Sequence, residues 1–464
     1  MLIPCEMASV PFFRPAHNCW KVEHASEAAL LVDGEDYFRA VRAAMMKAKK
    51  RIVLLSWDLD VRVEMHDTQH PVEGPLALGP FIDWLVKRNP DLHVYILRWD
   101  VGALKALGRG LTAFTLIRWT FHPRIHLKLD AHHPPSGSVH RKVITIDEDT
   151  AFCGGIDITE SRWDTREHQP ENPRRAVPGG SDKGPWHDAS MVVRGDVATR
   201  LAAYSVDRWK MAGGKPLMPA DPGAECWPDA LEPQFSDLPV AVARTEPEMN
   251  DQDEVREVEQ LFLDMIADAR RWIYAESQYF ASDAIAEALE RRLAEPDCPE
   301  FVLINPVTAD GAIEGAIMQP QRAVLLERML RGEHADKFRV YHPVTPEGSE
   351  IYCHAKIMIV DNAIFRIGSA NMNNRSMGFD SECDLAIHAD GDPQVEDRIA
   401  EIRNDLLAEH LAQSPETVAQ MLEQTGSVIE TIETLSSRAR DGGLRSLRPY
   451  RFPDHNPVER WIGE

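Results

Sequence analysis

Long apolar runs are missing from this sequence. No uninterrupted stretch reaches the roughly 18 apolar residues that a bilayer-spanning helix needs. The beginning, MLIPCEMASVPFFRPAHNCW, also lacks the basic start and the continuous apolar core of a secretory signal peptide. We therefore expect a cytoplasmic or peripheral membrane protein, while export by a signal-independent route stays open.

Paired cysteines are missing as well. The seven cysteines are scattered, and none of them is spaced as Cys-x-x-Cys. This pattern argues against a disulfide framework and a zinc knuckle, and it favours a reducing compartment. Four clustered histidines have no carboxylate or thiolate partner at a recognised ligand spacing: His122, His126, His132 and His133. We expect no metal and no other cofactor.

Basic residues are in short supply. The chain has 51 Lys and Arg against 74 Asp and Glu, which gives a formal net charge of -23. Nucleic-acid-binding proteins gain affinity by neutralising phosphates with Lys and Arg, so this overall charge would repel such a polymer. We expect no nucleic-acid partner, although a small, locally basic pocket is compatible with the composition. With 44% apolar and 27% charged residues, the chain should fold into globular domains.

The sequence contains an internal repeat. Around residue 140 the chain reads VHRKVITIDEDTAFCGGIDIT, and around residue 354 it reads CHAKIMIVDNAIFRIGSANMN. A His-x-Lys-x4-Asp pattern recurs with a single offset (354 − 140 = 214), and comprises His140, Lys142 and Asp147 in one copy and His354, Lys356 and Asp361 in the other. Each copy then runs into a small-residue turn. Two copies in register make coincidence remote.

The segments around the two motifs repeat too. In each half a helix-like stretch precedes an apolar run, RIVLLSW in one half and RWIYAES in the other. Alternating strands and amphipathic helices predict an α/β fold with two similar domains, each a central mixed β-sheet flanked by helices. We expect these domains at residues 1–217 and 252–464. The Pro-, Gly- and acid-rich stretch 218–251 is the predicted linker.

Each motif combines groups that a phosphate needs. Side chains alternate along a strand, so the His and the Lys of one motif should point to the same side. An imidazole attacks phosphorus or transfers a proton near neutral pH, and an ammonium offsets charge on the non-bridging oxygens. One histidine cannot attack and protonate the leaving group in the same step. Two copies of the motif solve this problem.

These residues resemble the paired HKD motifs of the phospholipase D superfamily. The resemblance runs roughly from Trp20 to His410. The words GGIDITESRWDT, PWHD, ESQYF and GSANMNNRSM resemble phospholipase D of eukaryotes and its bacterial relatives more than cardiolipin synthases or short nucleases. The resemblance implies a monomer whose two motifs face one another at the domain interface, and a reaction through a covalent phosphohistidine.

The resemblance also implies a role for individual residues. His140 is the expected nucleophile and His354 the general acid and base. The expected phosphate-binding residues are Lys142, Lys356 and Asn371, besides the two histidines. A carboxylate should fix each imidazole, and we expect Asp188 to serve His140 and Glu382 to serve His354. Asp147 and Asp361 belong to the motifs, with either a catalytic or a structural role.

The substrate is expected to be a phospholipid at a membrane surface. Hydrolysis of phosphatidylcholine or phosphatidylethanolamine, with transfer to alcohols, is the leading interpretation. A head-group pocket is expected from Trp163, His168 and Trp186. The stretch LTAFTLIRWTF, from Leu111 to Phe121, either contacts lipid or lies in the core. Two alternatives stay open, a cardiolipin synthase-like phosphatidyltransferase and, less favoured by the acidic charge, a phosphodiesterase or nuclease of the same superfamily.

Overall fold

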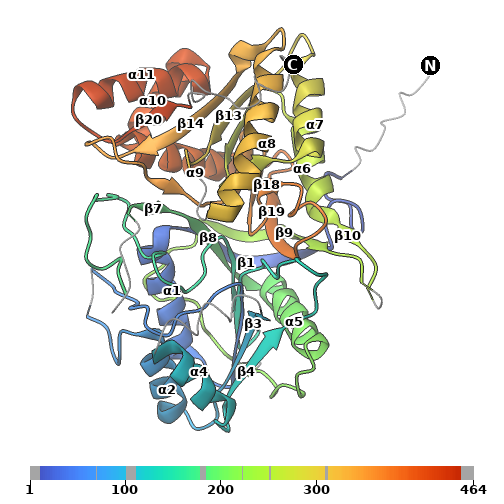
Figure 1. Cartoon of the computed structure of the whole chain (residues 1–464), viewed down its shortest axis with the longest axis vertical. Coiled ribbons are helices and arrows are strands. Elements are labelled where there is room, and N and C mark those ends of the chain that lie inside the picture. Colours follow the sequence, from blue (N-terminus) through green and yellow to red (C-terminus); the bar gives the residue numbers. More distant parts are fainter. Residues whose placement is uncertain are drawn as a thin grey trace.

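A single large β-sheet organises the molecule. The computed structural model describes residues 11–68, 71–100, 111–177, 184–221, 223–249, 252–308 and 312–450. Sixteen strands of mixed direction form the sheet, with helices packed against it (Figure 1). In Figure 1 the first half of the chain lies below, the second half above, and β1, β8 and β9 lie between them. The mixed α/β fold class expected from the sequence is confirmed, but the two halves share one sheet instead of each having a sheet of its own.

The strands of the two halves follow the same spatial order. From the centre to one edge, the first half contributes β1 (Lys21–Val32), β8 (Ala189–Gly195), β6 (Thr150–Gly154), β5 (Val143–Ile146), β2 (Arg51–Ser56), β3 (His93–Trp99) and β4 (Ile125–Asp130). The second half contributes β9 (Phe235–Glu246), β19 (Glu382–His388), β17 (Ile364–Gly368), β16 (Ile357–Val360), β11 (Trp272–Glu276), β13 (Glu300–Ile304), β14 (Phe338–Val344) and β20 (Ser446–Pro449). β10 (Val255–Arg256) pairs with β9. The internal repeat is therefore a repeat of structure.

Two small parallel sheets lie outside this sheet. β12 (Phe280–Ala281) pairs with β18 (Met372–Asn373), and β15 (Tyr352–Cys353) pairs with β7 (Trp186–His187). The second pair joins the two halves of the chain directly before two residues of interest, Asp188 and His354.

Three hydrophobic cores hold the helices to the sheet. One core extends through both halves and packs α5 (Asp196–Met211), α9 (Pro393–Leu411), α10 (Pro415–Thr425) and α11 (Val428–Asp441). A second core packs α1 (Asp33–Lys47), α2 (Leu78–Arg88) and α4 (Leu111–Thr120). The third packs α6 (Glu257–Asp268), α7 (Asp283–Leu293) and α8 (Ala312–Leu330), and a 3-10 turn at Ala335–Lys337 outside this core follows α8. Among the described residues, no helix has the length and hydropathy to span a bilayer.

Local sequence explains why the central strands and the C-terminal helices form. β5 and β16 read VITI and IMIV, and every residue of both is buried, as expected for strands covered on both faces. The three last helices begin at side chains that accept a hydrogen bond from a backbone N–H in the first turn, namely Asp392, Ser414 and Ser427.

The predicted linker requires a correction. Residues Phe235–Glu246 within it form β9, a 12-residue strand at the centre of the sheet. β9 pairs antiparallel with β1, where Lys21 faces Val242, and with β19 on its other side. The Pro-rich composition around this segment suggested a loop, although it contains the run VAVA. The residues of this run are buried because β9 pairs with strands from distant parts of the chain, and no local pattern in the sequence predicts that pairing.

Candidate active site

The two histidines of the repeat are each anchored by a backbone hydrogen bond to the other half of the chain. The His140 N–H donates to the carbonyl oxygen of Ser381, and the His354 N–H donates to that of His187. His140 directly precedes the segment that leads into β5, and His354 follows β15. Each histidine is therefore fixed against the other half of the chain, although the two are 214 positions apart (354 − 140 = 214) in the sequence.

His140 is held by Glu382. The Nδ1 atom of His140 lies 3.0 Å from both carboxylate oxygens of Glu382, which is fully buried at the start of β19. The hydroxyls of Ser369 and Ser376 donate to the same carboxylate. Burial opposes the charge of Glu382, but His140 and these hydrogen bonds lower its pKa to about 2. Glu382 therefore stays ionised, and the Nε2 atom of His140 is the one left for chemistry.

His354 is held by Asp188. Its Nδ1 atom lies 2.6 Å from Oδ2 of Asp188, at the junction of β7 and β8. Burial opposes ionisation of Asp188, but His354 and Lys356 lower its pKa to about 2. Burial and the charge of Lys356 lower the pKa of His354 well below its usual value, although Asp188 acts in the opposite direction. Burial and Lys356 therefore favour the neutral form of His354 in the free protein.

This pairing corrects the predicted one. The sequence analysis assigned Asp188 to His140 and Glu382 to His354, one pair in each half. In the structure each histidine receives its carboxylate from the other half. Asp188 directly precedes β8 and Glu382 begins β19, and these strands occupy equivalent places next to β1 and β9. Because β1 pairs with β9 at the centre of the sheet, each carboxylate lies beside the histidine of the other half. No spacing in the sequence predicts this arrangement.

Both lysines of the repeat are buried beside these pairs. The Lys142 ammonium donates to the carbonyl oxygen of His140 at 2.8 Å and lies 3.3 Å from Oδ2 of Asp157. The Lys356 ammonium donates to the carbonyl oxygen of His354. Burial and the charge of Lys142 lower the pKa of Lys356 to about 7, although Asp188 raises it. Two cations close enough to repel one another would be stabilised by an anion bound between them.

Asn371 and the glycine turns complete the surroundings. The Oδ1 atom of Asn371 is buried, and it has no hydrogen-bond partner among the described residues. A Cβ atom at Gly155 would lie 2.1 Å from Oδ1 of Asp188 and 3.3 Å from Cδ of Lys356. Glycine is therefore required at the first turn for the carboxylate and the lysine to occupy their places.

Asp147 and Asp361 serve the backbone, which supports the structural one of the two roles considered for them and not the catalytic one. Asp147 accepts hydrogen bonds from the backbone N–H groups of residues 49–51, and Asp361 accepts them from residues 270–272. Both aspartates have positive φ, 49° and 53°. Each one closes the turn after its strand and ties it to the beginning of the neighbouring strand.

The three predicted head-group residues lie in different surroundings. Trp186 stacks on Tyr352 with ring centroids 4.6 Å apart, and its ring lies 5.0 Å from that of His354. Trp163 is buried against His66 instead. His168 is fully buried and bonded through both ring nitrogens, so it does not line an open pocket. Of the three, the structure places only Trp186 beside a histidine of the repeat.

Sequence reasoning missed two side chains close to these histidines. The Trp57 ring lies 6.5 Å from that of His140. The Arg162 guanidinium lies over the Trp186 ring, 3.9 Å from its centroid. Arg162 lies within the segment GGIDITESRWDT, which the family resemblance had singled out as a whole.

His168 belongs to a buried network that joins the two halves and includes His187, the residue before Asp188. Its Nδ1 lies 3.0 Å from Asp164 and its Nε2 lies 3.0 Å from Glu409. His187 lies between Glu409 and Glu276, each 2.8 Å from one of its ring nitrogens. Because both nitrogens of each ring face carboxylates, these two imidazoles are satisfied when doubly protonated. Burial opposes that charge, but the carboxylates raise the pKa of His168 to about 9 and the pKa of His187 as well.

The same network has the donors of a divalent cation site. One atom each of Asp33, His168, His187 and Glu409 lies within 4.8 Å of the others, and His187, Glu276 and His410 form a second such group. The outward nitrogens of His168 and His187 face Asp164 and Glu276, as in the outer shell of many metal sites. Protonation of His168 and His187 adds two positive charges to this network, and one divalent cation bound to the neutral imidazoles would add the same charge. No ligand spacing marks this group in the sequence, because its donors come from distant segments.

Comparison with known proteins finds similarity to phospholipases D, both by a family model and by individual relatives. The Phospholipase D family model matches residues 332–442, which include the second motif. Phospholipase D1 of Saccharomyces cerevisiae is 24% identical over 82% of this chain and 28% of that protein. Phospholipase D alpha 1 of Vigna unguiculata is 22% identical over 80% of this chain and 60% of that protein. The chain thus spans less than two thirds of the length of these relatives.

A solved structure shares the fold. The crystal structure of phosphatidylserine synthase from Haemophilus influenzae Rd KW20 matches with a TM-score of 0.57 and 15% identity, over 90% of this chain and 97% of that one. At this identity the structural match supports the fold alone. The family model, the duplicated motif and the sequence relatives support the phospholipase D superfamily for this chain.

Proposed function

We propose that the chain is a phospholipase D that hydrolyses phosphatidylcholine or phosphatidylethanolamine to phosphatidic acid and the free head group. The observation that carries this proposal is the double pair, in which each histidine of the repeat lies on an ionised carboxylate from the other half. Two buried lysines beside these pairs, Lys142 and Lys356, supply the positive charge that a phosphodiester needs.

In the proposed first step, Nε2 of His140 attacks phosphorus, because Nδ1 is engaged by Glu382. The bond from phosphorus to the head-group oxygen breaks, and that oxygen leaves with a proton from His354. A phosphatidyl group stays on His140, and Glu382 stabilises the imidazolium that forms. In the second step His354 removes a proton from water, which displaces His140 and gives phosphatidic acid. An alcohol in place of water gives head-group exchange.

The low pKa of His354 sets a condition on this mechanism. A neutral His354 cannot donate a proton, so it must take one up before the first step. The negative charge of the bound phosphodiester favours that uptake, because an anion close to an imidazole stabilises its charged form. The order of the two histidines remains a prediction, and mapping of the phosphorylated residue decides it.

Contact with a membrane is proposed at helix α4. Trp119 and Leu116 of this helix pack into the core, whereas Phe114, Ile117 and Phe121 expose 69%, 59% and 84% of their surface. The three exposed residues follow the helical spacing of one face and its end. Large apolar side chains exposed together suit insertion into the boundary region of a bilayer.

Phosphatidyl transfer to an alcohol acceptor is the second candidate. It shares the first step, and only the acceptor of the phosphatidyl group differs. The test is a head-group-release assay over a panel of phospholipids, with and without a primary alcohol, and with His140→Ala and His354→Ala as controls. Release in water alone supports the phospholipase. Turnover that needs the alcohol supports the transferase. No release from any phospholipid, with folded protein, would rule out both.

A further inference from the structure

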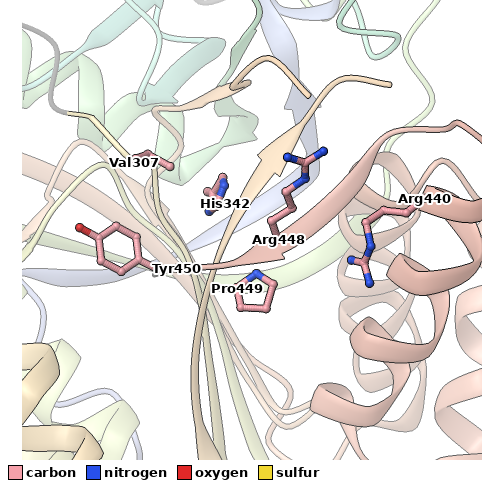
Figure 2. A pocket seen from close by; sticks show the side chains of 6 residues that line it. All are labelled: Val307, His342, Arg440, Arg448, Pro449 and Tyr450. Carbon is pink, nitrogen blue, oxygen red and sulfur yellow. The ribbon is translucent and has the colours of Figure 1, made fainter. Parts of the chain in front are cut away.

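A separate cavity lies at the carboxyl ends of β13 and β14. Its volume is about 650 Å³, and its lining comprises Val307, His342, Arg440, Arg448, Pro449 and Tyr450 (Figure 2). Strand β20 and helix α11 form one side of it. In parallel α/β sheets, ligands bind preferentially beyond the carboxyl ends of the strands. The size also falls within the range of small-molecule sites, about 300–1,000 Å³.

The cavity is basic in an acidic protein. Figure 2 shows Arg448 on β20 and Arg440 on α11 on the same side of His342. Arg322 is buried and donates to the hydroxyl of the lining residue Tyr450, to the Asn305 side chain and to backbone carbonyls. Within the described part of the chain, none of these three arginines forms an ion pair with a carboxylate. Arg440 and Arg448 are exposed, so in a chain of net charge -23 they form a locally basic surface at this cavity that attracts anions.

His342 adds an unsatisfied polar atom. Its Nδ1 is buried and has no hydrogen-bond partner among the described residues. Burial, followed by the charges of Arg448 and Arg322, lowers the pKa of His342 to about 4. The ring is therefore neutral at pH 7 and can still donate one N–H. Buried polar atoms without a partner are rare in folded proteins and call for an explanation such as a ligand.

The geometry points to a site for a phosphate-bearing ligand in this cavity, with Arg440 and Arg448 on the phosphate oxygens and His342 as a further donor. Arginine binds phosphate by paired N–H groups in a fixed fork, which suits it to this task. Val307, Pro449 and Tyr450 provide an apolar wall for an organic group attached to the phosphate. The ligand is either a free phosphate compound or the phosphomonoester head of phosphatidic acid. This site shares no residue with the proposed catalytic machinery and does not depend on it.

The test is direct binding to the purified full chain. Inorganic phosphate is titrated in one arm, and phosphatidylcholine vesicles with and without phosphatidic acid are used in the other. The double variant Arg440→Gln/Arg448→Gln should bind at least about tenfold more weakly, because hydrogen bonds to charged groups are lost. Arg438→Gln is the matched control, since Arg438 is exposed on the same helix and does not line the cavity.

The two arms also identify the source of the phosphate. Saturable binding of inorganic phosphate that the double variant weakens supports a free phosphate compound. A requirement for phosphatidic acid in the vesicles, lost in the double variant, supports the lipid. Equal loss in Arg438→Gln, or no binding in either arm, overturns the proposal. Head-group release from soluble substrates should be unchanged in the double variant, which separates this site from the proposed active site.

A second measurement uses only the wild-type chain, so it does not depend on whether the variants fold. In the NMR titration of the wild-type chain, bound phosphate should raise the pKa of the His342 ring, because the anion stabilises its charged form. An unchanged His342 titration at phosphate concentrations that saturate binding would contradict a site at this cavity.

Discussion

Asp188 and Glu382, which each hold the histidine of the other half, are the residues whose substitution tests the proposed mechanism most directly. In Asp188→Asn the amide cannot accept the Nδ1–H of His354 as a carboxylate does, so the ring loses its fixed tautomer and its counter-charge. We expect kcat to fall by about 10³-fold or more, as for other triad carboxylates. Steady-state head-group release measures this, with Glu433→Gln, an exposed carboxylate on α11, as the control. Near-normal turnover in Asp188→Asn would show that the pair has no part in catalysis.

A second residue-scale prediction separates the two histidines. Only the nucleophile becomes bonded to phosphorus, so a substrate with a very good leaving group should phosphorylate the His354→Ala protein. That adduct should persist, because the base that activates water is gone. Peptide mass mapping after quenching should find it on His140, and His140→Ala should give none. An adduct on His354 would reverse the order of the two residues and leave the two-step scheme intact.

The sequence was sufficient to predict the two histidines of the candidate site, but not which carboxylate holds each of them. The offset between His140 and His354 placed both motifs before equivalent strands, β5 and β16, and the structure keeps this equivalence. The partners of these histidines depend on which strands meet at the centre of the sheet. That choice is made by long-range pairing of β1 with β9, and it leaves no local pattern in the sequence.

At the scale of elements, helix α4 carries a prediction about lipid. Phe114→Asp/Phe121→Asp should lower turnover on phosphatidylcholine vesicles, since charged groups oppose insertion into the bilayer boundary. Turnover on soluble short-chain substrates should stay unchanged, because these residues are exposed and lie outside the candidate active site. A parallel loss on both substrates would instead indicate a structural role for the helix.

The sequence left the position of this helix open, and the reason is physical. The stretch Leu111 to Phe121 has apolar residues on more than one helical face, so its pattern fits both a buried helix and an exposed one. The structure buries the face with Trp119 and leaves the other face uncovered. β9 was missed for the opposite reason, since its turn-forming flanks suggested a loop around a strand that the whole sheet requires.

At the scale of the molecule, the buried network should make stability depend on pH. The pKa of His168 rises from 6.5 in the unfolded chain to about 9 in the fold. Its contribution is therefore complete below pH 6.5 and is lost as the pH rises through 9. We expect Tm to fall over this interval in the wild type and to fall less in His168→Gln, as measured by calorimetry.

Chelation distinguishes protons from a cation in this network. Metal binding requires deprotonated imidazoles, so a bound divalent cation would stabilise the fold more as the pH rises. With two protonated histidines, exhaustive chelation should leave Tm unchanged at every pH. A Tm that drops in chelator and recovers with one divalent ion would assign the network to that ion.

The exchange of carboxylates between the halves has a consequence for the autonomy of each repeat. A half-length chain would contain a histidine and a lysine of one motif, but its carboxylate would face nothing, and its imidazole would lack a counter-ion. Such a fragment could become competent only by meeting a complementary one, through strands equivalent to β1 and β9. The duplicated sequence is thus two copies of a unit that needs its partner to complete each histidine–carboxylate pair. The covalent connection keeps the two units at a high local concentration, whereas free halves would have to meet by diffusion.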